Sequence, residues 1–521
     1  MAGREFDGMA CFWRQSVAVS LALMLTWLAC GTASALAFDN PKARPPRAKP
    51  HRRSGGESVP PLPLPATPLR RSERKRQPAP PALIGMITFT GQPQYKIVQG
   101  QRRRVAGQKF PTTQVDIASL MRYANSKLKI RYRYMQTSLA KFSWDPTELP
   151  LLYITGWTPM PRLDKAVIAR LRRYLYDGGT LVLHAQCGRG EFHLSARREL
   201  AKIFPKRKLA MVDTDSPLFK AYFNIPQMRL RLGNEPVKTV PPLLEAVYLG
   251  CRPAILLSAV DLNCSWDIEN KPIGGGLLYH REDGLKLGVN IITTTLANFQ
   301  YARAWGTQKQ YPKPGPDSAG QELVVAQVAH AGDWDPTPHG LANLMKYIRQ
   351  ATTLKVQFQP QSVGLTDVEV FRHPVLYMTG LGDFKLARDE VLRLREYLSA
   401  GGVLIAEAAA GRKAFDVAFR REIKRVLPAG ELKLLPPGSP VYQRPFQITT
   451  VNYTAMVKAA NPALNAPMLE GITVAGQLGV IYSSMGLASG WEQLGLAYNR
   501  GYADTDALRL GVNIITYAMT H

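Results

Sequence analysis

The sequence is poor in cysteine and in acidic side chains. Only 5 cysteines stand among 521 residues, which excludes a small domain held by a dense disulfide framework. The 39 Asp and Glu are outnumbered by 66 Lys and Arg, and the formal net charge is +27. This charge favours anionic lipid, polyanionic envelope polymer or nucleic acid as a partner, although scattered basic residues also simply keep a protein soluble.

Long hydrophobic runs are absent after the first 37 residues. Within them, Arg14 precedes the apolar run SVAVSLALMLTWLAC, and small residues follow, with Ala35 and Ala37 at an A-x-A cleavage site. We therefore predict a signal peptide over residues 1–37 and export to the periplasm or cell envelope. Lipid attachment at Cys30 and retention as an anchor helix are the alternatives.

Large apolar residues are also scarce between residues 38 and 82, which are rich in proline and arginine. This composition predicts a disordered basic linker that serves as a tether. Its basic clusters could contact anionic lipid or envelope polymer. No aromatic side chain is interleaved with these clusters, so we expect no specific binding of nucleic acid.

The remainder of the chain is duplicated. The motif LGVNIIT occurs at Leu287–Thr293 and again at Leu510–Thr516, a separation of 223 residues (510 − 287). LLYITG is likewise matched by VLYMTG, and SPLFKAYFNI by SPVYQRPFQI. Repeats of this length indicate tandem domains, which we predict over 83–310 and 311–521.

Each copy alternates short apolar runs with amphipathic segments. In the second copy, VLIAEAA is typical of a buried strand, and ARDEVLRLREYLSAGG is typical of a helix that ends at glycine. The pattern predicts an α/β fold of two tandem three-layer Rossmann-like domains with mostly parallel sheets. Ligands bind such sheets beyond the carboxyl ends of the strands, and Cys187 follows one predicted strand.

Several motifs in order resemble the domain of unknown function 4159 family of bacteria. They include HAGDWDPTPHGLANLMKYI, LYMTG, YLSAGG and LRLGVNIITYA, and the first copy has the same frame with CG at Cys187. The family is similar in fold to class I glutamine amidotransferases and has no established activity. The resemblance therefore implies a glutamine amidotransferase-like architecture, and it implies no particular chemistry.

A thiol-dependent hydrolase is one hypothesis for the first copy. An amidotransferase-like enzyme needs a cysteine nucleophile, a histidine base and a carboxylate that orients the histidine. Cys187, His280 and Glu282 occur in that order, and their spacing is similar to that of an amidotransferase. The second copy has Ala410 and Asn499 instead, so it lacks the set.

A disulfide between Cys187 and Cys264 is a second hypothesis. The 223-residue register puts Ala410 opposite Cys187 (187 + 223 = 410), and aligning Trp266 with Trp491 puts Ser489 opposite Cys264, so both thiols are lost together. In an oxidising compartment such a bridge would stabilise the fold by about 4 kcal/mol in the chain-entropy model. Two small buried residues with no bond between them are the alternative.

A metal site is a third hypothesis, in which His184, His193 and Asp261 join the two thiols as ligands of zinc or copper. No two of these residues have the close CxxC or HxxxH spacing of common metal sites. We therefore predict neither a metal nor a cofactor.

Four charged residues are candidates for binding. Asp333 and Asp335 follow the first strand of the second copy, and Arg189 and Arg412 belong to a GR pair that both copies retain. The aspartates also suit a turn that leads into a helix cap, and the arginines could instead bond backbone carbonyls.

Taken together, these patterns predict an exported envelope protein that binds or scaffolds through two amidotransferase-like domains. The second copy lacks every candidate catalytic residue, which favours a protein without enzymatic activity. A thiol-dependent hydrolase or amidotransferase-like enzyme that uses Cys187 is the alternative.

Overall fold

The structure is a computed structural model, and it describes residues 79–87, 94–99, 101–105, 114–266, 276–305, 325–353 and 361–520. The predicted signal peptide lies outside these residues, as does the predicted linker except for its last four positions. No helix within the described residues combines the length and the apolar character needed to cross a membrane.

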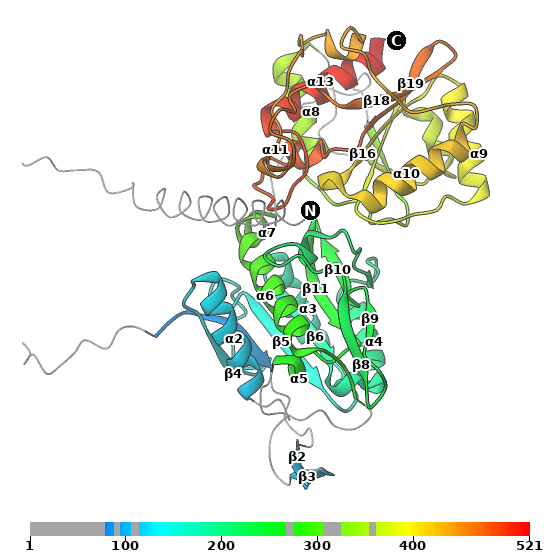
Figure 1. Ribbon diagram of the computed structural model, residues 1–521. Helices are drawn as coiled ribbons and strands as arrows, with labels where there is room; N and C mark the ends of the chain where they lie inside the picture. The colour runs from blue at the N-terminus through cyan, green and yellow to red at the C-terminus, as the bar shows by residue number, and fades with distance from the viewer. Residues whose placement is uncertain are drawn as a thin grey trace, which may run out of the picture. The chain divides into compact units, whose positions relative to one another are not determined.

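The first repeat is built on a seven-stranded sheet in the order β4-β1-β5-β6-β11-β10-β7 (Figure 1). The first five strands in this order run parallel, and β10 and β7 are antiparallel to their neighbours. The strands are β1 (Ala82–Ile87), β4 (Arg133–Thr137), β5 (Leu151–Gly156), β6 (Thr180–Ala185), β7 (Ala210–Met211), β10 (Glu245–Leu249) and β11 (Arg252–Ser258).

Helices cover both faces of this sheet. One face packs against α2 (Gln114–Leu128), α5 (Asn263–Trp266) and α6 (Arg281–Ala297). The other packs against α3 (Lys165–Tyr176), α4 (Gly190–Ile203) and α7 (Phe299–Trp305). Because both faces are covered, every residue of β5 and β6 is buried, which explains why these strands are continuous apolar runs.

The second repeat has the same topology, with the order β14-β13-β15-β16-β19-β18-β17 and the same strand directions. The prediction of two tandem α/β domains with mostly parallel sheets is therefore confirmed. The strands are β13 (Val325–Val328), β14 (Gln361–Val363), β15 (Val375–Gly380), β16 (Val403–Ala408), β17 (Lys433–Leu434), β18 (Leu469–Val474) and β19 (Gln477–Ser483).

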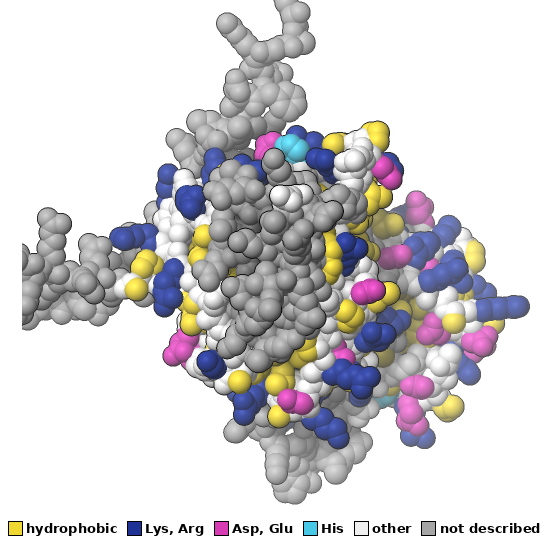
Figure 2. Space-filling view, turned by 90° about the horizontal axis from the view of Figure 1, so that it is seen from below, with side chains coloured by type: hydrophobic (Ala, Val, Ile, Leu, Met, Phe, Trp, Pro, Cys, Tyr) yellow, Lys and Arg dark blue, Asp and Glu magenta, His cyan; other side chains and the backbone are white. Residues whose placement is uncertain are grey.

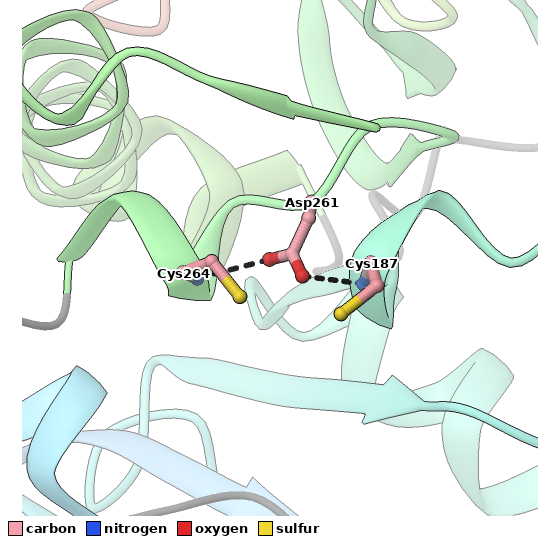
Figure 3. Close-up of side chains that lie close together, drawn as sticks. All are labelled: Cys187, Asp261 and Cys264. Carbon is pink, nitrogen blue, oxygen red and sulfur yellow. Dashed lines mark hydrogen bonds between the residues drawn. The ribbon is translucent and has the colours of Figure 1, made fainter. Parts of the chain in front are cut away.

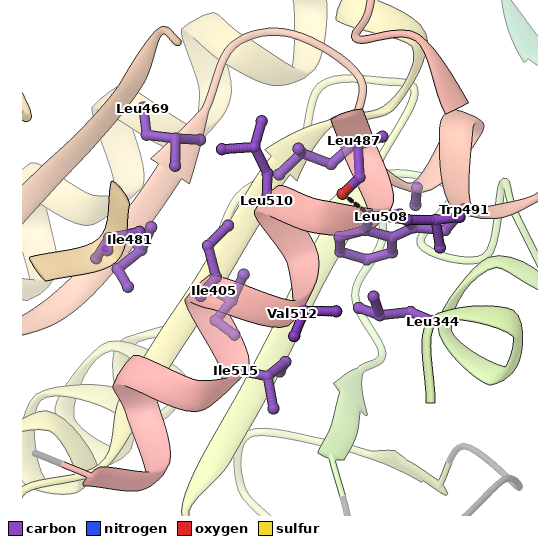
Figure 4. Packing of buried hydrophobic residues seen from close by; sticks show 14 of the residues in the cluster. Leu344, Ile405, Leu469, Ile481, Leu487, Trp491, Leu508, Leu510, Val512 and Ile515 are labelled. Atoms are coloured by element: carbon purple, nitrogen blue, oxygen red, sulfur yellow. Dashed lines mark hydrogen bonds between the residues drawn. The ribbon is translucent and has the colours of Figure 1, made fainter. Parts of the chain in front are cut away.

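The helices of the second repeat are also divided between two faces. The helices α8 (Gly340–Ala351), α12 (Ala488–Trp491) and α13 (Asp504–Thr520) pack on one face, and α9 (Arg388–Ser399) and α10 (Lys413–Val426) pack on the other. Figure 4 shows Ile405 of β16 in the first of these cores, near Leu344 of α8 and Val512 of α13.

The repeats differ in the segment that precedes the last long helix. The first has a three-stranded sheet of β8 (Met228–Leu232), β9 (Lys238–Val240) and β12 (Leu277–Tyr279), whereas the second has the short helix α11 (Ala455–Ala460). Other short elements are the hairpin β2 (Gln94–Val98) with β3 (Gln101–Val105), and the 3₁₀ turns η2 (Pro217–Phe219), η4 (Val368–Arg372) and η6 (Pro440–Tyr442).

The repeated motif LGVNIIT places one asparagine at the centre of each closing helix. In the second repeat, Asn513 donates to the carbonyls of Val441 (2.9 Å) and Phe446 (2.7 Å) and accepts from the Phe446 N–H (3.0 Å). In the first repeat, Asn290 makes the corresponding bonds to Phe223. The partners lie in the SPVYQRPFQI and SPLFKAYFNI segments, so two motifs that recur in the sequence bind each other in the fold.

We expect Asn513→Ala to lower the free energy of unfolding of the second repeat by about 3 kcal/mol, because it leaves buried backbone groups without their partner. Urea denaturation of the full chain measures this change. The matched control is Thr520→Ala at the exposed end of the same helix, which we expect to change the value by less than about 0.5 kcal/mol. Equal effects of the two substitutions would contradict the structural role of Asn513.

Candidate functional site

A sharp turn follows β6 at the carboxyl edge of the first sheet. It is the 3₁₀ turn η1 (Gln186–Gly188), after which α4 begins at Gly190. Cys187 has left-handed backbone angles in this turn, φ 50° and ψ 26°. A nucleophile held on a sharp strand-to-helix turn is typical of α/β hydrolases, so the position of Cys187 agrees with that hypothesis.

The same turn nevertheless occurs in the second repeat without a thiol. There η5 (Ala409–Gly411) places Ala410 at φ 50° and ψ 24°. The glycine that follows is required in both copies, because a Cβ would lie 2.5 Å from Leu277 Cβ at Gly188, and 2.5 Å from the Arg500 carbonyl oxygen at Gly411. The left-handed turn is therefore a property of the fold.

Cys187 lies in a compact group with Asp261 and Cys264 (Figure 3). Asp261 follows β11, and Cys264 belongs to α5. The two Sγ atoms and a carboxylate oxygen all lie within 4.8 Å of one another, and the sulfur atoms point into the same space. Both cysteines are free thiols in the structure. β6 and β11 are adjacent and parallel, so their carboxyl ends bring these residues together.

The Asp261 carboxylate holds the backbones of both cysteines. One oxygen accepts the N–H of Cys187, and the other accepts the N–H of Cys264 at 3.0 Å. Asp261 is completely buried. A buried carboxylate needs such partners, so this side chain links the turn after β6 to the start of α5.

The electrostatic surroundings disfavour a thiolate at Cys264. Its hydrogen bond with the Cys187 thiol raises the pKa of Cys264 well above the usual range, and burial and the negative charge of Asp261 add to this effect. A nucleophilic cysteine needs the opposite, a positive neighbour that lowers its pKa.

His184 and Tyr153 extend the polar group toward the centre of the sheet. His184 is completely buried on β6, and its Nε2 is hydrogen-bonded to the Tyr153 hydroxyl. Its Nδ1 lies 3.8 Å from Asp261 and 3.4 Å from the backbone nitrogen of Leu262. Burial lowers the pKa of His184, and Asp261 partly opposes that shift, so the ring is neutral near pH 7.

The second repeat supplies its carboxylate from a different position. Glu407 stands opposite His184 (407 − 184 = 223), and Gly486 stands opposite Asp261 when the tryptophans are aligned. Glu407 accepts the N–H groups of Leu487 and Ala488 at the start of α12. It also accepts the hydroxyls of Tyr377 and Thr379, each at 2.9 Å.

We did not predict from the sequence that the carboxylate moves from Asp261 in the first repeat to Glu407 in the second. A glutamate inside the apolar run VLIAEAA is the signal that could have indicated it. The side chain of Glu407 is completely buried, so its hydrogen bonds are needed for the fold. Gly486 has no room for a carboxylate of its own, because a Cβ there would lie 3.0 Å from Ala410 Cα and 2.6 Å from Ser489 Oγ.

The structure does not join His280 and Glu282 to Cys187. His280 is exposed at the start of α6 and forms a separate group with Glu282 and Asp283. Arg229 binds Glu282 at 3.0 Å and Asp283 at 2.8 Å. Within the described residues, no hydrogen bond connects Cys187 with His280.

Arg189 and Arg412 occupy equivalent places at the N-terminal ends of α4 and α10. The Arg189 guanidinium lies over the Trp157 ring, 3.9 Å from its centre. Its charge is thus exposed beside the carboxyl ends of β5 and β6. Binding of an anion by either arginine stays a prediction.

Asp333 and Asp335 lie in the loop that follows β13, where Asp333 has a left-handed φ of 59°. The residue that caps the N-terminus of α8 is His339, so the turn leads into the helix without an aspartate cap. His330 anchors this loop, because its Nε2 donates to the Thr379 carbonyl at 2.9 Å and its Nδ1 accepts the Gly332 N–H at 3.0 Å.

Comparison with known proteins identifies the family. The family described as Domain of unknown function (DUF4159) matches residues 108–296 and 324–519, so the chain belongs to it in two tandem copies. No protein with a curated description matches the chain. The similarity in fold to class I amidotransferases stays a prediction.

We expect Glu407→Gln to lower the free energy of unfolding of the second repeat by about 3 kcal/mol, because the new amide group would turn a donor toward other donors. Urea denaturation measures the change. Glu396→Gln on the exposed face of α9 is the matched control, and we expect it to be nearly neutral. A loss for Glu407→Gln no larger than that of the control would contradict the role of the buried carboxylate.

His330 should make the second repeat sensitive to acid. Burial lowers its pKa from 6.5 to about 4, so the unfolded chain binds more protons than the folded chain between these values. We therefore expect stability to fall as the pH drops from 7 to 4, with His330 contributing up to about 3 kcal/mol of the loss. In urea denaturation across this range, the stability difference between the native chain and His330→Asn should shrink by that amount. A constant difference would contradict the assignment.

Proposed function

We propose that this member of a family without an assigned activity is an exported protein of the bacterial envelope that binds or scaffolds and does not catalyse. The observation that carries the proposal is the recurrence of the strand-to-helix turn around Ala410, which has no nucleophilic side chain. A turn that is kept without a nucleophile serves the fold, and its presence at Cys187 is therefore no sign of catalysis.

The surroundings of Cys187 also argue against a nucleophile. The neighbours of its thiol are Cys264 and a buried carboxylate, and the candidate base His280 belongs to an exposed group with Glu282 and Asp283. A cysteine nucleophile needs a base within hydrogen-bond reach, and no hydrogen bond between described residues joins Cys187 to His280.

Export is supported by the sequence of the first 37 residues, where a charged start, an apolar run and small residues follow one another. A protein delivered in this way would work in the periplasm or at the cell envelope. The basic proline-rich segment over residues 38–82 would then separate the two repeats from the membrane region.

The basic linker is our candidate for contact with anionic lipid or envelope polymer. Figure 2 shows one face of the molecule, on which Lys and Arg side chains are spread among acidic and apolar ones. Such scattered charge gives a weaker local field than clusters of like charge do. The linker has two dense clusters, RR at Arg52–Arg53 and RRSERKR at Arg70–Arg76.

The alternative function is a thiol-dependent hydrolase or amidotransferase-like enzyme in the first repeat. It would place the nucleophile on a strand-to-helix turn, as in α/β hydrolases, although Ala410 has the same turn without a nucleophile. It requires His280 and Glu282 to lie within reach of the Cys187 thiol. In this structure, no hydrogen bond between described residues joins either of them to Cys187.

Binding to anionic vesicles tests the proposal. The full chain is produced in a bacterial host, and mass spectrometry of the mature protein locates its N-terminus, which we expect after Ala37. The mature protein should then sediment with phosphatidylglycerol vesicles at low salt and be released as salt rises. Neutral phosphatidylcholine vesicles should not bind it.

The matched control keeps the linker length and replaces its Lys and Arg residues by Gln. We expect this variant to fold normally and to lose vesicle binding. Equal binding by both proteins would overturn the assignment to the linker. An unprocessed N-terminus with all of the protein in the cytoplasm would overturn export.

A further inference from the structure

We infer that Cys187 and Cys264 are a redox pair that closes to an intramolecular disulfide across the carboxyl edge of the first sheet. Closure in the cell rests on the export proposed above, because the exported compartment is oxidising. The pairing itself rests on the geometry of the first repeat.

The fold places the two thiols close together. The two cysteines come from segments 77 residues apart (264 − 187), and the fold brings their sulfur atoms within 4.8 Å. Asp261 fixes both backbones by accepting one N–H from each cysteine. Figure 3 shows both sulfur atoms on the same side of that carboxylate, so the two thiols share one space in which a bond can form.

The buried charge of Asp261 beside the two thiols also favours the disulfide. In the reduced state, two thiols lie beside a buried carboxylate, and their mutual hydrogen bond and burial hold Cys264 in the protonated form. A disulfide removes both ionisable groups from this site and leaves Asp261 with its two backbone partners. The oxidised state is thus free of the repulsion that a thiolate would meet.

The second repeat shows that the buried carboxylate and the two thiols are separate features. The second repeat keeps a buried carboxylate at the start of its short helix, through Glu407, although it has Ala410 and Ser489 in place of the thiols. The carboxylate is therefore explained by the helix that it caps, in both copies. Both thiols are replaced in the second repeat, as expected for members of a bonded pair.

A metal ion bound by Cys187, Asp261 and Cys264 is the main competitor. It would require both thiols to lose their protons beside a carboxylate that is completely buried. Since the second repeat shows that the carboxylate is needed without any thiol, its presence in the group is no sign of a cation. We therefore favour the disulfide and treat the metal as an outcome of the test.

The chemistry balances with a disulfide oxidant such as oxidised glutathione. One thiol of the pair loses its proton and attacks one sulfur of the oxidant, and one glutathione thiol leaves. The other thiol then loses its proton and attacks the protein sulfur of the mixed disulfide, and the second glutathione leaves. Two protein thiols are oxidised, and one glutathione disulfide is reduced to two thiols.

The closing experiment compares two samples by mass spectrometry, alkylated under denaturing conditions without reduction and then digested. The first sample is the mature protein isolated from the periplasm. The second is the reduced full chain treated with oxidised glutathione in vitro. In both we expect a peptide pair that links Cys187 to Cys264, with Cys251 alkylated as the internal control.

A linked pair in the second sample supports the inference even if no mature protein is recovered from the periplasm, and that combination overturns only the proposed export. Free thiols at both positions in protein recovered from the periplasm would overturn closure in the cell. Alkylation of both Cys187 and Cys264 after oxidation in vitro overturns the inference. So does one equivalent of zinc that resists dialysis in a protein whose two thiols stay free, since it identifies the metal site.

Thermal unfolding provides an independent measurement. Reduction should lower the Tm of the first repeat by about 10 °C in the oxidised native chain, because the bridge closes a long loop. The same treatment should leave Cys264→Ser unchanged, while Cys251→Ser should behave like the native chain. A native chain that is insensitive to reduction would contradict the bridge.

Discussion

Each repeat depends on one buried carboxylate that accepts backbone N–H groups at the start of a short helix. In the first repeat Asp261 does this for α5 and also holds the turn after β6, and in the second repeat Glu407 does it for α12. Without it, N–H groups at the carboxyl edge of the central strands would be buried without a partner. The turn, the short helix and the strand ends are therefore placed by a single side chain.

The two repeats supply this carboxylate from different segments at the carboxyl edge of the sheet. In the first repeat it comes from the loop after β11, and in the second from the strand β16. With the carboxylate on the loop at Asp261, the strand position is occupied by His184, and the thiols of Cys187 and Cys264 face each other. In the second repeat the carboxylate belongs to Glu407 on the strand. Gly486, which has no room for a side chain, stands opposite Asp261, and both thiols are absent. The second repeat thus has a buried carboxylate at the same edge without the two thiols that lie beside it in the first.

The duplication, the alternation of strands and helices and the mostly parallel sheets could all be predicted, because they rest on local periodicity and on motifs such as LGVNIIT. The proximity of Cys187 and Cys264 also follows from two apolar runs that end at cysteine. The exchange of Asp261 for Glu407 could not be predicted, because it joins a strand to a loop about 80 residues away (487 − 407). His280 directly follows β12 of the small β12-β8-β9 sheet, which has no counterpart among the described residues of the second repeat, so its exposed place could not be predicted from the repeat pattern.

Hydrogen exchange at single amides tests the central role of the carboxylate most directly. The amides of Cys187 and Cys264 should exchange as slowly as that of Val182 inside β6, because Asp261 accepts both. In Asp261→Ala these two amides should exchange much faster, while Val182 stays protected. If the Cys187 and Cys264 amides exchanged quickly in the native chain, or were unaffected by the substitution, the carboxylate would not hold this edge of the fold.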